Sequence, residues 1–278
     1  MEPWGGVDLS FNQSLADGYS SQSQVARVLS QDWVERQLYC PACLATDLEP
    51  TPENTHSRDF NCGTCSEPFE LKSRSNPFQS RVLNGEYHTM LATIQESRTP
   101  NLLLLEYDRV AYAVRNLTVI HRNLLGQSAI LARKSPLSDA ARRRGWLGCY
   151  IDLSNIPSAG RIQLIHSGVL FPPELVHKTW RSFEFLGRMD PSTRGWLADV
   201  LACVDTLPGG TFALDDVYQF ESRLQRLHPA NSNVRPKIRQ QLQVLVREGL
   251  IERTEPGMYR RLSVGPARSE GPRAEPSV

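Results

Sequence analysis

The chain has 278 residues, a hydrophobic fraction of 40% and a formal net charge of +1, which fit one large globular domain or two modest ones. It has no apolar run as long as a membrane span, and its first residues lack the basic and apolar regions of a signal peptide, so we expect a cytoplasmic protein without membrane contacts. Residues 1–72 carry four Lys or Arg against eleven Asp or Glu, whereas residues 73–278 carry 27 against 19. This asymmetry fits metal binding in the first part and phosphate binding in the second, or else ordinary solvated surface.

The first element that the sequence predicts is a helix, because Val25, Val28, Leu29 and Trp33 recur at helical spacing within residues 22–36. This helix leads into two short cysteine pairs with the spacing C-x2-C-x18-C-x2-C. The pairs consist of Cys40, Cys43, Cys62 and Cys65. Four thiolates at this spacing predict one closed, structural Zn²⁺ site in a reducing compartment, and the alternative is fortuitous pairs or redox-active thiols.

Acidic and basic side chains surround the second cysteine pair. Residues 69–72 alternate between apolar and charged, which predicts a strand with Glu70 and Lys72 on one face. Asp59, Glu70 and the Leu71 carbonyl offer the oxygen ligands that Mg²⁺ prefers, and Lys72 is suited to activate water or to neutralise charge at a phosphate. The sequence therefore predicts a metal-dependent phosphodiesterase site held in place by the zinc knuckle. The alternative is an exposed strand with ordinary surface charge.

The middle of the chain predicts a layered α/β core. Asn84-Gly85 predicts a turn, and residues 87–96 predict an amphipathic helix. Residues 102–105 are four leucines in succession, which is typical of a central strand covered on both faces. Further strands are predicted at residues 110–114, 117–120, 150–153 and 161–165. The strand–helix–strand order favours an α/β domain over an all-helical one.

The pattern changes near residues 183–191, after which three helices and a hairpin are predicted. The helices are expected to start at Ser192 or Thr193, to span residues 214–227, and to start at Arg235 with Pro236 as the first helical residue. A turn at Pro256-Gly257 predicts the hairpin. We therefore expect a first domain at residues 1–185, a winged-helix (helix-turn-helix) domain at residues 186–262 and a disordered tail at residues 263–278.

Two basic segments predict contacts with DNA. The first consists of Arg142, Arg143, Arg144 and Trp146. Arginines suit phosphates and guanine edges and an indole offers a flat apolar contact, while the alternative is a solvated loop with a core tryptophan. The second lies on the polar face of the third C-terminal helix, which carries Arg235, Lys237, Arg239, Gln240, Gln243 and Arg247. Of these, Arg235, Lys237, Arg239 and Gln240 are expected to contact DNA. These side chains suit the major groove, and the alternative is a winged helix that contacts proteins.

Several stretches also carry a resemblance to a known family. They are Gln31-Asp32-Trp33-Val34-Glu35-Arg36-Gln37, Tyr39-Cys40-Pro41-x-Cys43, Asp59-Phe60-x-Cys62-x-x-Cys65-Ser66-Glu67-x-Phe69-Glu70-Leu71-Lys72-Ser73, Ala141-Arg142-Arg143-x-Gly145-Trp146-x-Gly148-Cys149, Ile151-Asp152-Leu153-Ser154 and Lys237-Ile238-Arg239-Gln240-Gln241-Leu242-Gln243. Together, and in this order, they resemble the DpnI-type methyl-directed restriction endonucleases and the Dam-replacing proteins. The resemblance runs from about Leu9 to Leu262.

The resemblance implies an α/β PD-(D/E)xK nuclease core with an embedded four-cysteine zinc site, followed by a winged helix, with both domains reading GATC sites that carry N6-methyladenine. By motif match it implies that Asp59, Glu70 and Lys72 are catalytic, that the four cysteines bind zinc and that Trp146 lies near the methyl groups. The sequence departs from the family pattern in having Arg58 before Asp59, Pro236 near the start of the recognition helix, and a C-terminal tail.

The sequence thus predicts a Mg²⁺-dependent type II endonuclease with structural Zn²⁺, which cleaves double-stranded DNA at N6-methyladenine GATC sites as a nucleoid-associated monomer. One alternative is a non-enzymatic zinc-ribbon and winged-helix transcription regulator. Another is a catalytically silent reader of methyladenine, which would keep Trp146 without the metal ligands. The set of Asp59, Glu70 and Lys72 beside a zinc knuckle favours the enzyme, since a regulator has no need of it.

Overall fold

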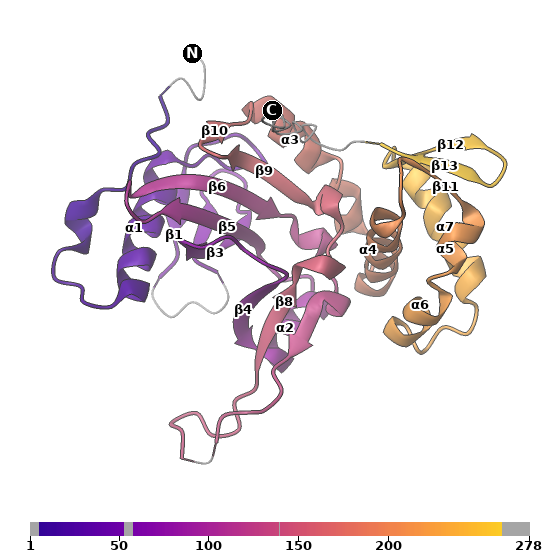
Figure 1. Ribbon diagram of the computed structural model, residues 1–278, viewed down its shortest axis with the longest axis horizontal. Helices are drawn as coiled ribbons and strands as arrows, with labels where there is room; N and C mark the ends of the chain where they lie inside the picture. Colours follow the sequence, from indigo (N-terminus) through magenta and orange to yellow (C-terminus); the bar gives the residue numbers. More distant parts are fainter. Residues whose placement is uncertain (1–5, 53–57, 139, 263–278) are drawn as a thin grey trace, which may run out of the picture.

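The centre of the first domain is a mixed seven-stranded sheet (Figure 1). The computed structural model describes residues 6–52, 58–138 and 140–262. The strand order is β1-β2-β3-β5-β6-β9-β10, with β3 and β5 parallel and the other neighbours antiparallel. The strands are β1 Leu48–Pro50, β2 Phe60–Cys62, β3 Pro68–Arg74, β5 Asn101–Asp108, β6 Ala113–Ile120, β9 Arg161–His166 and β10 Val169–Leu170.

Both faces of this sheet are covered. The helices of the first domain are α1 Gln22–Gln37, α2 Tyr87–Gln95 and α3 Pro173–Arg181, and α1 contacts β1 and β3 while α3 contacts β9. Helix α2 contacts a second sheet of the order β4-β8-β7, with β4 Arg81–Glu86, β8 Gly148–Asp152 and β7 Ile130–Ala132. Short 3₁₀ helices lie at Gln13–Ala16, Arg122–Leu124, Gln127–Ala129, Leu153–Asn155, Ser158–Gly160 and Glu184–Arg188.

Strand β5 supplies both faces of the main sheet. Leu103 and Leu105 belong to the core beneath α1 and α3, whereas Leu102 and Leu104 belong to the core that contains α2 and the second sheet. All four leucines are at most 5% exposed. A strand that is covered on both faces needs a continuous apolar run, so the predicted central strand is confirmed. The predicted helices at residues 22–36 and 87–96 are confirmed as α1 and α2.

The predicted turn at Asn84-Gly85 is wrong. Both residues lie inside β4, at a bulge where the pairing with β8 shifts register between Asn84 and Glu86. Asn-Gly is a strong local signal for a hairpin turn, but the same two residues also fit the irregular backbone of a bulge. The pairing partner β8 is more than sixty residues away in sequence, so the local signal cannot distinguish the two.

The predicted strand at residues 110–114 is also wrong over most of its length. The Asp108 carboxylate accepts hydrogen bonds from the backbone N–H groups of Val110 and Ala111 at 2.7 and 2.8 Å, which forms a turn after β5. Val110 is 93% exposed, and β6 begins at Ala113. The predicted strands at residues 117–120, 150–153 and 161–165 fall on β6, β8 and β9, whereas β4, β7, β10 and α3 were not predicted.

The second domain confirms the predicted winged helix. Its elements are α4 Pro191–Thr206, β11 Thr211–Ala213, α5 Leu214–Tyr218, α6 Glu221–Leu227, α7 Val234–Arg247, β12 Ile251–Glu255 and β13 Met258–Arg261. The hairpin of β12 and β13 forms as predicted, and β11 adds a third strand in the order β11-β13-β12. The tail predicted at residues 263–278 lies outside the described residues.

The start of α4 differs from the prediction. Asp190 is the N-cap, and its carboxylate accepts a hydrogen bond from the Thr193 N–H at 2.9 Å, with Pro191 as the first helical residue. Ser192 and Thr193 are therefore inside the helix. Aspartate followed by proline is itself a strong helix start, because the carboxylate satisfies a free N–H group and proline lacks one.

Two other helix predictions in this domain also need correction. The helix expected at residues 214–227 is divided into α5 and α6, because the chain leaves helical geometry around Phe220. Val217, Phe220 and Leu224 continue one apolar stripe across the break, so periodicity alone does not reveal it. Helix α7 begins at Val234, whose side chain is buried, and Pro236 is therefore its third residue rather than its first.

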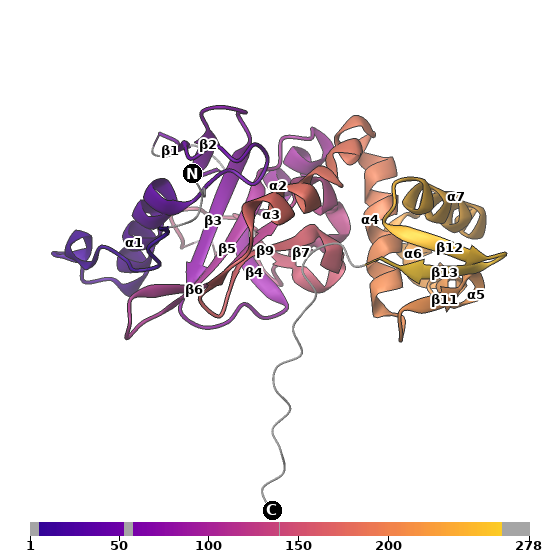
Figure 2. The ribbon, with the colours of Figure 1, turned by 90° about the horizontal axis from the view of Figure 1, so that it is seen from above.

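Helix α4 is the helix of the second domain that packs against the first domain (Figure 2). On its buried face, Asp199 accepts a hydrogen bond from the Ser128 hydroxyl of the first domain. The other oxygen of the same carboxylate lies 2.7 Å from Nε2 of His228, which belongs to the second domain and stacks on Trp196 at 4.0 Å. The buried carboxylate thus binds both domains to the same helix.

His121 predicts a loss of stability in acid. Its ring is packed beside Trp180, and Nδ1 accepts the backbone N–H of Asn123 at 3.2 Å, which requires the neutral form. Burial, with smaller effects of Arg122 and Arg194, lowers the pKa of His121 from 6.5 to about 3.

Because the unfolded chain therefore takes up this proton first, the free energy of unfolding should fall as pH drops from 6.5 towards 3. By pH 5 the loss from this group is about 2 kcal/mol. Urea unfolding at pH 7 and pH 5 measures it, and His121→Phe, which keeps a ring, should show a smaller difference between the two pH values. An equal difference in the variant would contradict the assignment.

Candidate active site and thiolate cluster

The predicted catalytic residues meet at an open edge of strand β3. β2 pairs with β3 only as far as Phe60 and Phe69, so β3 has no strand neighbour on this side from Glu70 onward. Asp59, which precedes β2, bonds to this part of β3. Its N–H donates to the Phe69 carbonyl at 2.8 Å, and its carboxylate accepts the Leu71 N–H at 2.7 Å. The Asp59 side chain is therefore held directly beside Glu70 and Leu71.

Glu70 and Lys72 point to the same face of β3, as the period of two predicts. Lys72 Nζ lies 2.7 Å from Glu70 Oε1, and Glu70 is only 8% exposed. The buried Cys149 of β8 lies near this pair. Burial, followed by the negative charges of Glu70 and Glu86, raises the pKa of the Cys149 thiol to about 11, so this thiol stays protonated and neutral.

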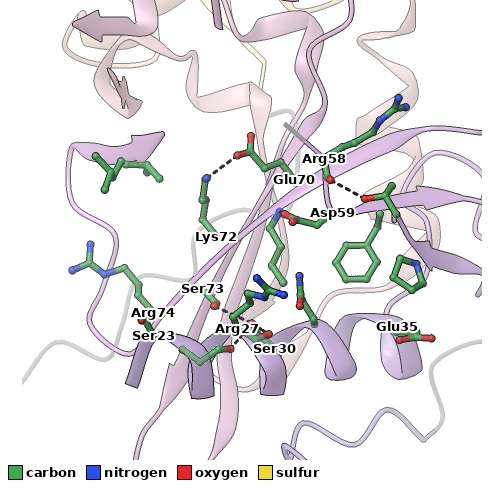
Figure 3. Close-up of a pocket in the computed structure, with 18 of the residues that line it drawn as sticks. Ser23, Arg27, Ser30, Glu35, Arg58, Asp59, Glu70, Lys72, Ser73 and Arg74 are labelled. Atoms are coloured by element: carbon green, nitrogen blue, oxygen red, sulfur yellow. Dashed lines mark hydrogen bonds and ion pairs between the residues drawn. The ribbon is translucent and has the colours of Figure 1, made fainter. Parts of the chain in front are cut away.

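These residues line a cleft of about 820 Å³ (Figure 3). One wall is the strand edge with Asp59, Glu70 and Lys72, another is α1, and a third is the start of β4. Besides Lys72, the basic side chains in the lining are Arg27, Arg58, Arg74 and Arg81. Two carboxylates among several cations give a site that can bind a divalent metal and a phosphate together.

The sequence prediction did not include the contribution of α1 to this cleft. Ser23, Arg27, Gln31 and Glu35 recur every four residues and form one polar stripe of the helix along the cleft. The buried hydroxyl of Ser30 lies 2.9 Å from that of Ser73 and joins the helix to β3. A polar stripe at four-residue spacing beside the apolar one is the signal that would have revealed this wall.

The four predicted zinc ligands form one cluster. Their Sγ atoms all lie within 4.8 Å of one another, with 3.6 Å between Cys40 and Cys65 and 3.5 Å between Cys43 and Cys62. A disulfide would need about 2.05 Å, whereas tetrahedral Zn–S bonds of about 2.3 Å place sulfurs roughly 3.8 Å apart. The cluster therefore fits a tetrahedral metal site and no disulfide.

The two cysteine pairs have the same backbone conformation. The Cys40 N–H donates to the Ala45 carbonyl and the Leu44 N–H to the Cys40 carbonyl, both at 2.8 Å. The corresponding bonds in the second pair run from Cys62 to Glu67 at 3.0 Å and from Ser66 to Cys62 at 2.8 Å. Leu44 and Ser66, which follow the second cysteine of each pair, have positive φ angles of 65° and 63°. Each pair is thus one copy of the same knuckle.

The second knuckle connects β2 to β3, so it lies in the chain between Asp59 and Glu70. Glu67, which accepts the knuckle hydrogen bond, also accepts from Asn101 at 2.9 Å and pairs with Arg122 at 3.1 Å. The knuckle is in this way attached to the start of β5 and to the 3₁₀ helix that follows β6. The position of Asp59 relative to Glu70 consequently depends on the geometry of the cysteine cluster.

The predicted basic loop lies apart from the cleft lining. Arg142, Arg143 and Arg144 are exposed in the long β7–β8 connection, which projects from the domain (Figure 1). Trp146 is half-buried beside Gly148, where a Cβ atom would come within 2.7 Å of the indole. Glycine therefore allows the indole to lie against the backbone at the start of β8. The same β8 strand pairs with β4, whose first residues do line the cleft.

The four predicted residues of α7 lie on different parts of its surface. At 100° per residue, the exposed face is centred on Pro236, Gln240, Gln243 and Arg247. Gln240 is thus central, whereas Arg235 and Arg239 lie on the flank next to α5 and Lys237 lies half-buried on the opposite flank. Gln243 and Arg247, which the sequence also placed on the polar face of this helix, lie with Gln240 on the exposed face.

An α/β domain with a carboxylate-containing cleft, followed by a winged helix, fits the class of DNA-binding nucleases. The model of the Dam-replacing family matches residues 7–189, and the model of the Dam-replacing HTH domain matches residues 192–261. The chain therefore belongs to the DpnI, or Dam-replacing, family of restriction endonucleases, which confirms the resemblance seen in the sequence. Within the described residues, no helix combines the length and apolar character needed to cross a bilayer.

Proposed function

We propose that this protein is a Mg²⁺-dependent type II restriction endonuclease that cleaves double-stranded DNA at GATC sites carrying N6-methyladenine. The observation that carries the proposal is the convergence of Asp59, Glu70 and Lys72 at the open edge of β3, inside a cleft with a basic lining. Family membership supports the choice of DNA as the substrate. A transcription regulator would have no use for a buried glutamate paired with lysine in such a cleft.

The donor set fits Mg²⁺. The carboxylates of Asp59 and Glu70 and the main-chain carbonyl of Leu71 would hold the ion, because it prefers oxygen ligands. When bound, Mg²⁺ polarises a phosphate and lowers the pKa of water. Lys72 is placed to hold or accept the proton of the attacking water, or to neutralise charge that develops on the phosphate. Its ion pair with Glu70 keeps the ammonium in the cleft.

The cysteine cluster fits structural Zn²⁺, with Cys40, Cys43, Cys62 and Cys65 as ligands. Four protein ligands leave no open position, so this metal would take no part in the chemistry. Its part is to fix the knuckle between Asp59 and Glu70. The proposed protein is thus organised as a zinc-containing nuclease domain at residues 1–185 and a winged helix at residues 186–262, acting as a monomer.

Recognition is assigned to two surfaces. The arginines Arg142, Arg143 and Arg144 would hold phosphates while Trp146 contacts the methyl groups. The α7 residues would enter the major groove and consist of Arg235, Lys237, Arg239 and Gln240, together with Gln243 and Arg247. Burial of one methyl group against an indole should stabilise the complex by about 0.8 to 1 kcal/mol. Two methyl groups would then give roughly tenfold to thirtyfold preference for methylated DNA.

The proposal is tested with a short duplex that contains one GATC site, either methylated or unmethylated, in Mg²⁺ or in Ca²⁺. In Mg²⁺ we expect cleavage of the methylated duplex to be at least about tenfold faster than that of the unmethylated one, and in Ca²⁺ we expect binding without cleavage. Cleavage that continues after removal of all divalent metal by EDTA would exclude the proposed use of Asp59 and Glu70.

Trp146→Ala should reduce the preference for methylated DNA about tenfold, because the apolar contact with the methyl groups is lost. The measurement is the ratio of cleavage rates on methylated and unmethylated duplexes. Tyr19→Ala is the control, because it truncates an exposed aromatic side chain that lies before α1 and outside both recognition surfaces. An unchanged ratio in Trp146→Ala would remove this residue from the recognition surface.

A further inference from the structure

The two arginines on the flank of α7 share one aromatic partner. Tyr218, the last residue of α5, has the Arg235 guanidinium 5.0 Å and the Arg239 guanidinium 5.6 Å from its ring centroid. The Arg239 Nε also donates a hydrogen bond to the Tyr218 hydroxyl. Arg235 and Arg239 are four residues, or about one helical turn, apart, so one ring contacts both arginines along the same flank of α7.

A carboxylate holds the first of these arginines. Arg235 Nε lies 2.7 Å from Glu221 Oε2 at the start of α6, and the two side chains are 58% and 40% exposed. Exposed ion pairs of this kind are weak, so a DNA phosphate can displace the carboxylate. In the free protein, Glu221 offsets part of the positive charge of Arg235 on this flank of α7.

We propose that Tyr218 and Glu221 are positioning residues that determine how strongly the winged helix discriminates its target from other DNA. The proposal rests on the assignment of α7 to DNA binding made above. Tyr218 holds both guanidinium groups in place before DNA arrives, so less conformational freedom is lost on binding. Glu221 keeps Arg235 away from phosphates in loosely bound complexes and releases it when the rest of α7 is seated.

Glu221→Gln tests the second part in the full-length protein. In loosely bound complexes Arg235 should gain a phosphate contact, so affinity for a duplex without GATC should rise several-fold and its log–log salt dependence should steepen by about 0.9. The methylated GATC complex already has this contact, so its salt slope should stay unchanged. Binding is measured by fluorescence anisotropy in Ca²⁺ between roughly 50 and 200 mM salt. Glu184→Gln is the matched control, because it removes the same charge from an exposed Arg–Glu pair in the first domain.

Tyr218→Ala and Tyr218→Phe test the first part. Tyr218→Ala should weaken binding to methylated GATC DNA about tenfold and change non-specific binding little, since only the specific complex needs both arginines in place. Tyr218→Phe keeps the ring and should bind within about threefold of wild type. Thermal unfolding of each variant separates this effect from a loss of folded protein, which would weaken both kinds of binding equally.

The proposal is overturned if Glu221→Gln leaves the non-specific salt slope unchanged, or if Tyr218→Phe binds as weakly as Tyr218→Ala. It is also overturned if the wild type binds no DNA, because that result would exclude the DNA binding by α7 on which the proposal rests. A wild type that binds methylated DNA without cleaving it contradicts only the proposed nuclease activity, because none of these measurements requires cleavage.

Discussion

Asp59→Asn and Lys72→Met are each expected to lose cleavage activity on the order of 10³-fold or more while still binding methylated DNA. Asn at position 59 keeps an oxygen to accept the Leu71 N–H, so the strand edge should remain in place while the charged metal ligand is lost. Met at position 72 keeps the length of the lysine stem and removes the ammonium. Recognition should persist because the loop around Trp146 and helix α7 lie outside the cleft lining.

This expectation is checked by cleavage rates in Mg²⁺ and by anisotropy in Ca²⁺ on the same duplex. Glu184→Gln provides a control that changes an exposed charge away from the cleft. Removal of the Asp59 charge also removes negative charge near the phosphate, so binding without metal should be equal to or tighter than that of the wild type. Variants that cut at nearly the wild-type rate would show that Asp59 and Lys72 are not catalytic, whereas a wild type that does not cut would favour the regulator alternative.

Cys62→Ser is expected to unfold the first domain rather than to leave a folded, inactive enzyme. Zinc sites in small domains contribute about 10–16 kcal/mol of apparent binding free energy, which is comparable to the entire stability of a typical domain, about 5–15 kcal/mol. Cys62 is buried, and its knuckle is bonded through Glu67 to Asn101 and Arg122. The unfolding that follows loss of the metal should therefore extend from the knuckle into β3 and β5.

Zinc content by elemental analysis and unfolding by circular dichroism measure this effect. Cys203→Ser is the matched control, because Cys203 is also buried but lies in α4 outside the cluster. The control should retain stoichiometric zinc and lose only about 1–3 kcal/mol from burial of a new hydroxyl. A stable Cys62→Ser protein that contains no zinc and cleaves DNA would contradict a structural metal.

The sequence signals that succeeded are short-range ones with a fixed geometric meaning. The alternation around Glu70 and Lys72, the spacing of the four cysteines and the four leucines of β5 each correspond directly to a strand period or a ligand distance. The sequence also assigned Asp59 to this site, because the second cysteine pair separates it from Glu70. Nothing in the local pattern shows that its carboxylate would accept the Leu71 N–H across the strand edge.

The signals that failed depend on partners far away in the chain. Asn84 lies in a strand because β8 pairs with it, and α1 lines the cleft because Ser30 meets Ser73. Likewise, Tyr218 contacts two arginines of α7 because α5 packs against α7. The sequence pattern of α7 predicts only the arginines. Long-range packing of this kind is absent from any periodicity of a single segment.

The most direct test of the proposed function is a digest of one plasmid, prepared with and without adenine methylation, in Mg²⁺ and in EDTA. We expect discrete fragments from the methylated plasmid in Mg²⁺, at a rate at least about tenfold above that of the unmethylated plasmid, and no cutting of either in EDTA. Equal cutting of both plasmids, or no cutting of the methylated one by folded, zinc-loaded protein, would contradict it.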